Sequence, residues 1–300
     1  MGFKLLFDFD LLSRHHSVVT LEELQAEGWN GHLDAVGHFG RSVWAWIKMT
    51  RELNVTDEGA TYINFGRFDC SATNLERVAQ KLATYKFVGT PVYENIVKDA
   101  GIGLPLRVTG RTCNNLYLQV SGHLTKSSRI KSIARSFRAK RLGGAEVPYV
   151  AVHVRPYTDL CLPWWHADKY DKGKASKVCL NGHLYLVFIE ETVQHVKRLE
   201  ETVGKGKAKL FVMSYPELRP LITKKYDEVG LKAVFYDMPD LESELGYRPS
   251  ISMLGMVEQE IAFQANIFIG SSRSTMTGMV QQERFARGVP MEDNTLFTSK

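Results

Sequence analysis

The sequence has no long apolar run. No uninterrupted apolar stretch of about 18 residues occurs in its 300 residues, so we expect no transmembrane helix. A secretory signal is also missing, because Asp8 and Asp10 fall inside what would have to be its apolar core. The compartment is therefore unknown, and we expect a cytoplasmic protein unless the chain is a piece of a secretory-pathway protein.

Two common nucleotide-binding loops are absent as well. The segment GIGLPL at Gly101 lacks the third glycine of a dinucleotide fingerprint, and Pro105 would break the helix that must follow. GKGKAK at Gly204 has neither the spacing of a Walker loop nor a Ser or Thr after its lysine. The net charge of +5 is mild, so it suits an anionic ligand without requiring a nucleic-acid or membrane partner.

A strand followed by charged residues is the first positive signal. In Pro148 to Asp159, PYVAVHVRPYTD, the apolar run from Tyr149 to Val152 predicts a short buried strand. His153 and Arg155 follow at its C-terminal end. Open α/β sheets bind their ligands at that edge, so these two residues are candidates for a binding site.

A second strand leads into an anion-binding turn. In NIFIGSSRSTMTGMVQQER, Ile267 to Ile269 predict a strand, Gly270 breaks it, and Ser271 to Thr275 supply hydroxyls and N–H groups at the start of a helix. The free N–H groups and the helix dipole both favour negative charge. An arginine at one strand end and this turn at another suggest a nucleotide diphosphate as the shared ligand.

Helices and strands alternate from Tyr149 onward, which predicts a parallel, Rossmann-like sheet. The further elements predicted there are strands at Leu210–Met213 and Ala233–Tyr236 and helices at His183–Val203, Leu218–Val229 and Ile251–Gln264; His183–Ile189 also has an open reading as a strand. Upstream we predict a helix at Leu21–Ala26 capped by Thr20, a loop at Gly28–Gly40, a strand at Tyr62–Phe65, a helix at Leu75–Tyr85 and a strand at Leu116–Val120.

Two features have competing interpretations. Ser127–Leu142 predicts a basic amphipathic helix, which could bind nucleic acid or anionic lipid, although a solvated face on a helix packed against the sheet is favoured. Gly143 ends this helix, and a domain boundary is expected near it. His32, His38 and Asp34 could be metal ligands, but their spacing fits no common zinc pattern and an ordinary surface loop is favoured.

The motifs resemble those of a known family. PYVAVHVRPYTDLC is similar to the His-x-Arg strand of the GDP-fucose-dependent protein O-fucosyltransferases and their plant and α1,6-fucosyltransferase relatives. NIFIGSSRSTMTGMVQQER resembles their later strand, Ser/Thr-rich turn and helix, and FDFDLLSRHHSVVTLEEL resembles their Phe-Asp strand. The match is good from about Leu118 to Gly288, fair from Leu5 to Leu24, and absent between Gln25 and Asn115.

This resemblance implies an α/β, GT-B-like fold with two Rossmann-like domains, of which the N-terminal one is shortened or divergent. Residues 1–145 would form the acceptor-side domain, and residues 146–300 would bind the GDP-sugar. Relatives open with a Gly-Gly-Asn turn before the Phe-Asp strand, and no room for it exists upstream of Phe7. We therefore expect a shortened version of the fold, either a natural divergence or a piece of a longer polypeptide.

The resemblance also implies an activity. Relatives transfer L-fucose from GDP-fucose to a hydroxyl of a glycan or protein, with inversion and without a metal or other cofactor. Arg155 would be catalytic, because a guanidinium can meet two phosphate oxygens at once. The implied nucleotide contacts are His153, Arg155, Asp159, Glu258, Ser274, Thr275 and Met276, with Glu258 near the guanosine and Met276 where relatives have an aromatic residue.

Several points stay open at this stage. The chain could bind a nucleotide sugar without transferring it, or use a sugar nucleotide other than GDP-fucose. The catalytic base is unassigned, and neither Asp8 nor Asp10 is favoured for it. Cys161 and Cys179 stand where secreted relatives have a cysteine pair that could form a disulfide in an oxidising compartment.

Overall fold

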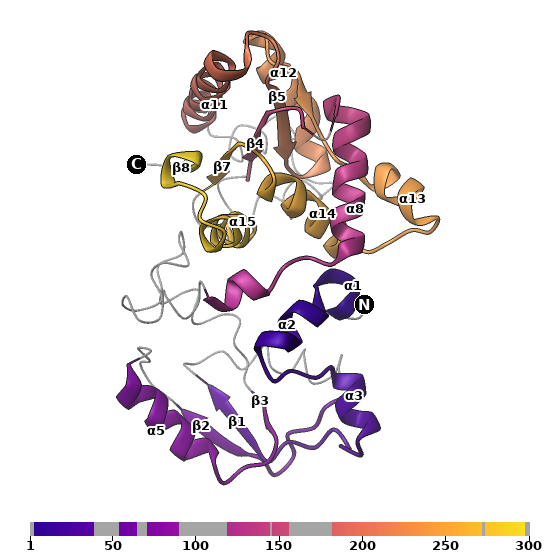
Figure 1. The fold of residues 1–300 in the computed structure, drawn as a ribbon, viewed down its shortest axis with the longest axis vertical. Helices are drawn as coiled ribbons and strands as arrows, with labels where there is room; N and C mark the ends of the chain where they lie inside the picture. Colours follow the sequence, from indigo (N-terminus) through magenta and orange to yellow (C-terminus); the bar gives the residue numbers. More distant parts are fainter. Residues whose placement is uncertain are drawn as a thin grey trace, which may run out of the picture. The chain divides into compact units, whose positions relative to one another are not determined.

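The computed structural model describes residues 3–38, 54–64, 71–89, 119–144, 146–155, 182–271 and 274–297. The chain forms two compact units (Figure 1). The larger contains Met1–Phe7 and Lys126–Lys300, and the smaller contains Asp8–Thr125. In the described ranges, no helix is long and apolar enough to cross a membrane.

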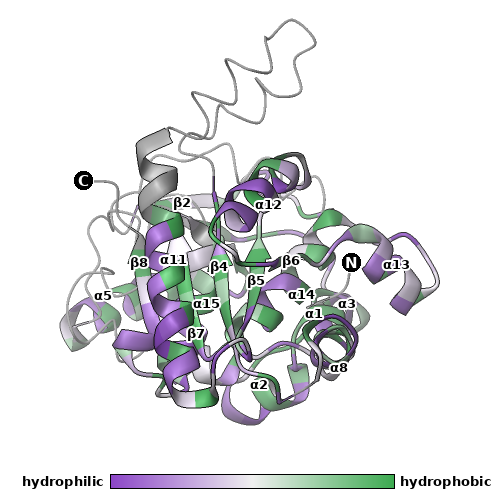
Figure 2. Cartoon of the chain, turned by 90° about the horizontal axis from the view of Figure 1, so that it is seen from above, coloured by the Kyte–Doolittle hydropathy of each residue, from purple (hydrophilic) through white to green (hydrophobic). Residues whose placement is uncertain are grey.

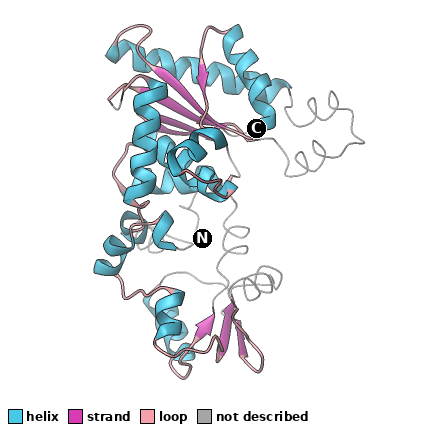
Figure 3. Cartoon of the chain, turned by 90° about the vertical axis from the view of Figure 1, so that its right-hand side faces the viewer, coloured by secondary structure: helices cyan, strands magenta, loops and turns pink. Residues whose placement is uncertain are grey.

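The larger unit is built on a five-stranded parallel sheet. Its strands are β4 (Tyr149–His153), β5 (Lys209–Met213), β6 (Ala233–Val234), β7 (Ile267–Ser271) and β8 (Asn294–Phe297). They lie in the order β6-β5-β4-β7-β8, and each neighbouring pair is parallel. Figure 3 shows these strands side by side in magenta. The strands predicted around Tyr149–Val152, Leu210–Met213 and Ile267–Ile269 are therefore confirmed, and the one predicted at Ala233–Tyr236 is present but ends at Val234.

Helices cover both faces of this sheet, because side chains along each strand alternate between two hydrophobic cores. Tyr149 and Ala151 pack in one core, whereas Val150 and Val152 pack in the other. Helices α8 (Ser128–Phe137), α13 (Met238–Leu245) and α14 (Ile251–Phe263) contribute to the first core, and α11 (Gly182–Val203) and α12 (Arg219–Glu228) contribute to the second. In Figure 2 the central strands are largely green, as this double burial requires.

The remaining helical elements of this unit are short or follow the last central strand. They are α1 (Phe3–Leu6), a π-helical turn at Arg138–Leu142, 3-10 turns at Pro216–Leu218 and Met291–Asp293, and α15 (Thr275–Ala286). The helices predicted at Ser127–Leu142, Leu218–Val229 and Ile251–Gln264 are confirmed. For the segment that begins at His183, a strand and a helix were both open, and the structure has a helix, which is part of α11.

The division into units differs from the boundary expected near residue 145. Helix α8 belongs to the larger unit, because Ile130, Ile133 and Phe137 are buried in the same core as Val257 and Ile261 of α14. The glycines that follow it end a helix and do not separate two units: Gly143 has a left-handed φ of 92°.

The smaller unit carries a three-stranded parallel sheet in the order β2-β1-β3. Its strands are β1 (Ala35–His38), β2 (Thr61–Asn64) and β3 (Val88–Gly89), and its helices are α2 (Phe9–His15), α3 (Leu21–Ala26) and α5 (Ala72–Leu82). Trp29, Leu33 and Val36 form its buried core. The capping box at Thr20 and Glu23 is present as predicted.

Three predictions in the N-terminal half are wrong. The segment that resembles a Phe-Asp strand is helical, because Asp8 caps α2 by accepting from the N–H of Leu11 at 2.9 Å. The expected loop at Gly28–Gly40 contains β1, which Asp34 ties to the segment before β3 by accepting from the N–H groups of Lys86 and Phe87. The described end of the strand expected at 116–120 is part of a helical segment at 119–123.

Candidate functional site

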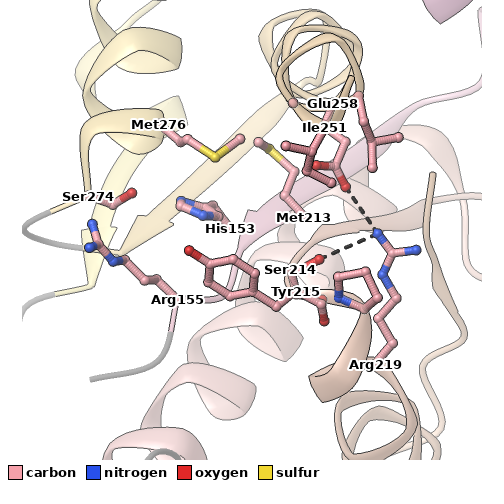
Figure 4. Close-up of a pocket in the computed structure, with 13 residues that line it drawn as sticks. His153, Arg155, Met213, Ser214, Tyr215, Arg219, Ile251, Glu258, Ser274 and Met276 are labelled. Atoms are coloured by element: carbon pink, nitrogen blue, oxygen red, sulfur yellow. Dashed lines mark hydrogen bonds and ion pairs between the residues drawn. The ribbon is translucent and has the colours of Figure 1, made fainter. Parts of the chain in front are cut away.

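A cavity of about 260 Å³ lies where the carboxyl ends of β4 and β5 meet the starts of the neighbouring helices (Figure 4). It is lined by His153, Arg155, Met213, Ser214, Tyr215, Pro216, Arg219, Ile251, Leu254, Gly255, Glu258, Ser274 and Met276. This is the sheet edge at which the sequence placed its candidate ligand-binding residues. All of these residues belong to the larger unit.

His153 is the last residue of β4, and its ring is buried. Its Nδ1 shares a hydrogen bond of 2.7 Å with Oγ1 of Thr277, from the first turn of α15. Burial, together with the positive charge of Arg155, lowers the pKa of His153 to about 3. The imidazole is therefore neutral near pH 7, and it can offer a hydrogen bond to a ligand but no charge.

The backbone of Arg155, just beyond the end of β4, is held in place by hydrogen bonds. Its backbone N–H donates to Oγ of Ser271 at 3.1 Å, and that hydroxyl donates to the carbonyl of His153 at 2.6 Å. Ser271 therefore links the carboxyl ends of β4 and β7. The Arg155 side chain is half-buried and lines the cavity, so a permanent positive charge is presented to any ligand there.

Helix α15 has its N-terminus at the same cavity. Ser274 is the N-cap of α15, accepting from the N–H of Thr277 at 3.5 Å, and Met276 lies in the first turn. Gly270 lets this helix approach the strand, because a Cβ at that position would lie 2.2 Å from Cγ2 of Thr277. Figure 4 shows Ser274 and Arg155 on the same side of the cavity. The helix start and the guanidinium therefore both add positive potential there.

A buried ion pair lies in another part of the cavity lining. Glu258, in the middle of α14, is only 6% exposed, and its Oε1 lies 3.4 Å from Nη2 of Arg219 on α12. Burial raises the pKa of Glu258 to about 8, although the charge of Arg219 acts in the opposite direction. Arg219 is held in turn by the carbonyls of Tyr236, at 2.8 Å, and Ser214, at 3.4 Å.

Most of the site residues expected from the sequence lie together. His153, Arg155, Glu258, Ser274 and Met276 all line this cavity. Thr275 is the first residue of α15, but its side chain lies outside the described part. Asp159, Cys161 and Cys179 lie outside the described residues.

Sequence reasoning missed Arg219 and Tyr215. Tyr215 directly follows the strand predicted at Leu210–Met213 and the polar Ser214, and it is 40% exposed at the cavity. The rule that placed His153 and Arg155 at a strand end could have found it. Arg219 gives no such signal, because it reaches the cavity from the first residue of α12 through contacts with the carbonyls of Ser214 and Tyr236 and with Glu258.

Basic residues of helix α8 and of the turn that extends it pair with helix α13 of the same unit. Lys140 and Arg141, in the turn that extends it, pair with Glu244 and Asp240 of α13 at 2.6 and 3.1 Å, and Arg129 donates to the carbonyl of Glu244. These contacts favour the interpretation of α8 as a helix packed on its own domain over a surface for nucleic acid or lipid.

The alternative metal site gains no support from the described residues. No group of three potential metal ligands occurs among them. Asp34, one of the three candidates, accepts two backbone N–H groups and serves the small sheet. The side chain of His38 lies outside the described part.

Comparison with known proteins gives a match in structure and none in sequence. No family model matches the chain, and no curated protein gives a significant match. Crystal structures of POFUT1, a GDP-fucose protein O-fucosyltransferase, superpose over all of this chain and 85% of theirs. The complex with GDP gives a TM-score of 0.59 at 15% identity, the apo form 0.60 at 16%, and a complex with GDP-fucose 0.58 at 19%.

At such low identity the likeness establishes the fold. The chain has an α/β, GT-B-like fold with parallel sheets, as the resemblance of its motifs implied. The POFUT1 structures that share this fold were solved with GDP and with GDP-fucose bound.

Proposed function

We propose that this chain is a glycosyltransferase that moves L-fucose from GDP-fucose to a hydroxyl group of a glycan or protein. The observation that carries the proposal is the shared cavity of Arg155, the α15 N-terminus and Glu258. The protein that gives the matching fold was crystallised with GDP-fucose. A cation and a helix start suit a diphosphate, and a carboxylate suits the paired N–H groups of guanine.

The reaction follows from the charges that develop. An acceptor oxygen attacks the anomeric carbon, the bond from that carbon to the β-phosphate oxygen breaks, and GDP leaves with the bonding electrons. The acceptor hydroxyl passes its proton to water or to the departing diphosphate, and attack from the opposite face inverts the anomeric centre. In this scheme Arg155 and the α15 N-terminus stabilise the growing negative charge of the diphosphate. Neutral His153 adds a hydrogen bond without competing for that charge.

We propose that the diphosphate is neutralised by protein groups and without a metal ion. Arg155 supplies a full charge and the helix N-terminus about half of one. The prediction is tested by transfer assays with and without EDTA, in which equal rates are expected. A rate restored only by Mg²⁺ or Mn²⁺ would mean that Arg155 and the helix are insufficient. Asp159 and Thr275 remain predicted nucleotide contacts.

The decisive experiment compares Arg155→Ala with the wild type. We expect GDP-fucose to give binding heat by calorimetry with the wild type. Transfer or donor hydrolysis by Arg155→Ala should fall at least about 100-fold, the usual cost of losing a group that stabilises transition-state charge. Arg248→Ala is the matched control, because its side chain is 84% exposed and outside the cavity. It should behave as the wild type.

The outcomes separate the remaining alternatives. Binding of GDP-fucose without transfer or hydrolysis would reduce the chain to a nucleotide-sugar-binding protein. Stronger thermal stabilisation by UDP-sugars or dTDP-sugars than by GDP-fucose would indicate another donor. If Arg155→Ala kept full activity, the assignment of the diphosphate to this cavity would be wrong.

A further inference from the structure

The pair formed by Glu258 and Arg219 has an arrangement that binding of a diphosphate does not explain. Glu258 is a buried carboxylate that lines the cavity, and its Oε1 contacts Nη2 of Arg219. Among the described residues, no other group donates a hydrogen bond to this carboxylate. Oε1 of Glu258 thus accepts from Arg219, and Oε2 has no hydrogen-bond donor within the described chain.

Arg219 is fixed by several contacts of its own. Its Nη2 also donates to the carbonyls of Ser214 and Tyr236, at the ends of β5 and β6. The guanidinium lies over the ring of Phe235, with 5.3 Å between its carbon and the ring centroid. The cation is therefore held in one place, where it fixes the position of Glu258 and opposes the effect of burial on the pKa of that group.

Guanine is the base that such a carboxylate would recognise. Its N1–H and its exocyclic amine are adjacent donors, and an ionised carboxylate accepts from both, since each oxygen has two lone pairs. Uracil and thymine offer one N–H between two carbonyls. A protonated carboxyl group would place its own O–H donor against one of these guanine donors, and one of the two hydrogen bonds would be lost.

We infer that Arg219 is a positioning residue that makes this cavity select guanine, by fixing Glu258 toward the base and favouring its ionised form. The inference rests on the proposed function, since it takes the nucleotide of the donor to lie in this cavity. It adds to that function the residue on which base selection depends.

The electrostatic surroundings support this role. Burial raises the pKa of Glu258, and the positive charge of Arg219 opposes that rise. The other titratable groups nearby are Tyr236, whose pKa is raised chiefly by burial and also by the charge of Glu258, and the cavity residues His153 and Arg155. Without Arg219, burial would go unopposed, and Glu258 would be protonated over a wider range of pH.

The test titrates the full chain with GDP and with inosine diphosphate, which lacks the exocyclic amine, between about pH 6 and 9. For the wild type, GDP affinity should rise with pH as Glu258 ionises and then level off. For Arg219→Met, this rise should move about one to two pH units higher. Its preference for GDP over inosine diphosphate at neutral pH should fall about tenfold.

Further variants separate positioning from general support of the fold. Arg219→Lys keeps the charge and should restore most of the wild-type pH profile. Glu258→Gln should abolish the pH dependence, and adding Arg219→Met to it should leave the ratio of GDP to inosine diphosphate affinity unchanged. Equal weakening of both nucleotides by Arg219→Met at every pH, in both backgrounds, would overturn the inference.

Failure of the proposed function has a different signature. If the wild type bound no GDP, both the function and the role of Arg219 would be lost. If it bound GDP and transferred fucose, but Arg219→Met kept the wild-type pH profile and base preference, only the role of Arg219 would be refuted.

Discussion

The two ends of the strands in the five-stranded sheet, its amino edge and its carboxyl edge, each carry an arginine, and the two arginines differ in how completely they are hydrogen-bonded. At the amino edge, Arg284 of α15 is 1% exposed, and all three of its nitrogen atoms donate hydrogen bonds. The acceptors are Oδ1 of Asn294 and the carbonyls of Phe263, Ala265, Asn266 and Asp293. At the carboxyl edge, Arg219 uses only Nη2 toward the described residues, and its Nε is buried without a partner there.

This difference indicates which edge is built for stability and which for a ligand. A fully bonded arginine that joins the end of α14 to the starts of β7 and β8 fastens the sheet. At the carboxyl edge, the buried Nε of Arg219 has no partner among the described residues, which lowers stability. The neighbouring Glu258 lines the cavity, where a ligand can donate to it. The motif from Asn266 to Arg284 contains a residue for the ligand and a residue for stability. Ser274 lines the cavity, and Arg284 at the end of the motif is a structural anchor.

The largest effect on the comparison between the two edges is expected from Arg284→Met. Several buried carbonyls would lose their donor at once, so we expect the free energy of unfolding to fall by at least about 3 kcal/mol. Urea denaturation followed by circular dichroism measures this. Arg287→Met is the matched control, since Arg287 lies three residues further along the chain and is exposed. Stability equal to that of the control would mean that the amino edge does not depend on this arginine.

A smaller loss is expected from Gly270→Ala, at the junction between β7 and α15. The new methyl group would lie 2.2 Å from Cγ2 of Thr277, the residue that bonds to His153. Relief of this clash by a shift of α15 should cost about 1 to 3 kcal/mol, measured by thermal and urea denaturation, and it should weaken GDP binding as well.

Gly278→Ala is the control for that substitution. Gly278 lies in the same helix, and a methyl group there would meet no atom within 4 Å. Replacing a helical glycine should raise stability by about 0.5 to 1 kcal/mol. If both variants behaved alike, the close approach of α15 to β7 would be unimportant for the fold.

The sequence predicted the larger unit better than the smaller one, for physical reasons. A strand that is buried on both faces, such as β4, is a continuous apolar run, and its end is marked by His153 and Arg155. β1 is not a continuous apolar run, because it contains Gly37 and lies among glycine-rich segments. α13 was missed although Asp237 and Asp240 form a capping box around Pro239 at its start.

Local capping also overruled the resemblance near the N-terminus. The Phe-Asp segment alternates apolar and acidic residues, which suits a strand, but Asp8 caps the N–H of Leu11 and a helix follows. The role of Arg284 was equally out of reach. A sequence motif matches residues to a family pattern but does not show their surroundings. Only the packing of the folded chain buries Arg284 and places Arg155 at a cavity.

The smallest expected effect is a gain in stability, from substitution of Glu258 at the carboxyl edge. In the folded protein the pKa of Glu258 is raised to about 8, from the ordinary value of 4.5. Below pH 4.5 the group is protonated in both the folded and the unfolded chain, and as the pH rises toward 8 the unfolded chain releases its proton first. Glu258 therefore lowers the stability of the folded state progressively across that range.

Glu258→Gln cannot lose a proton, so its advantage over the wild type should grow between pH 5 and 8, reaching about 1 to 2 kcal/mol at pH 8 by urea denaturation. Glu201→Gln, at an exposed position of α11, should keep the wild-type trend. GDP affinity of Glu258→Gln should fall under the same conditions, because the amide cannot accept both guanine donors. A loss of stability at pH 8 would instead make Glu258 a structural residue like those of the amino edge, and the division of labour between the two edges would not hold.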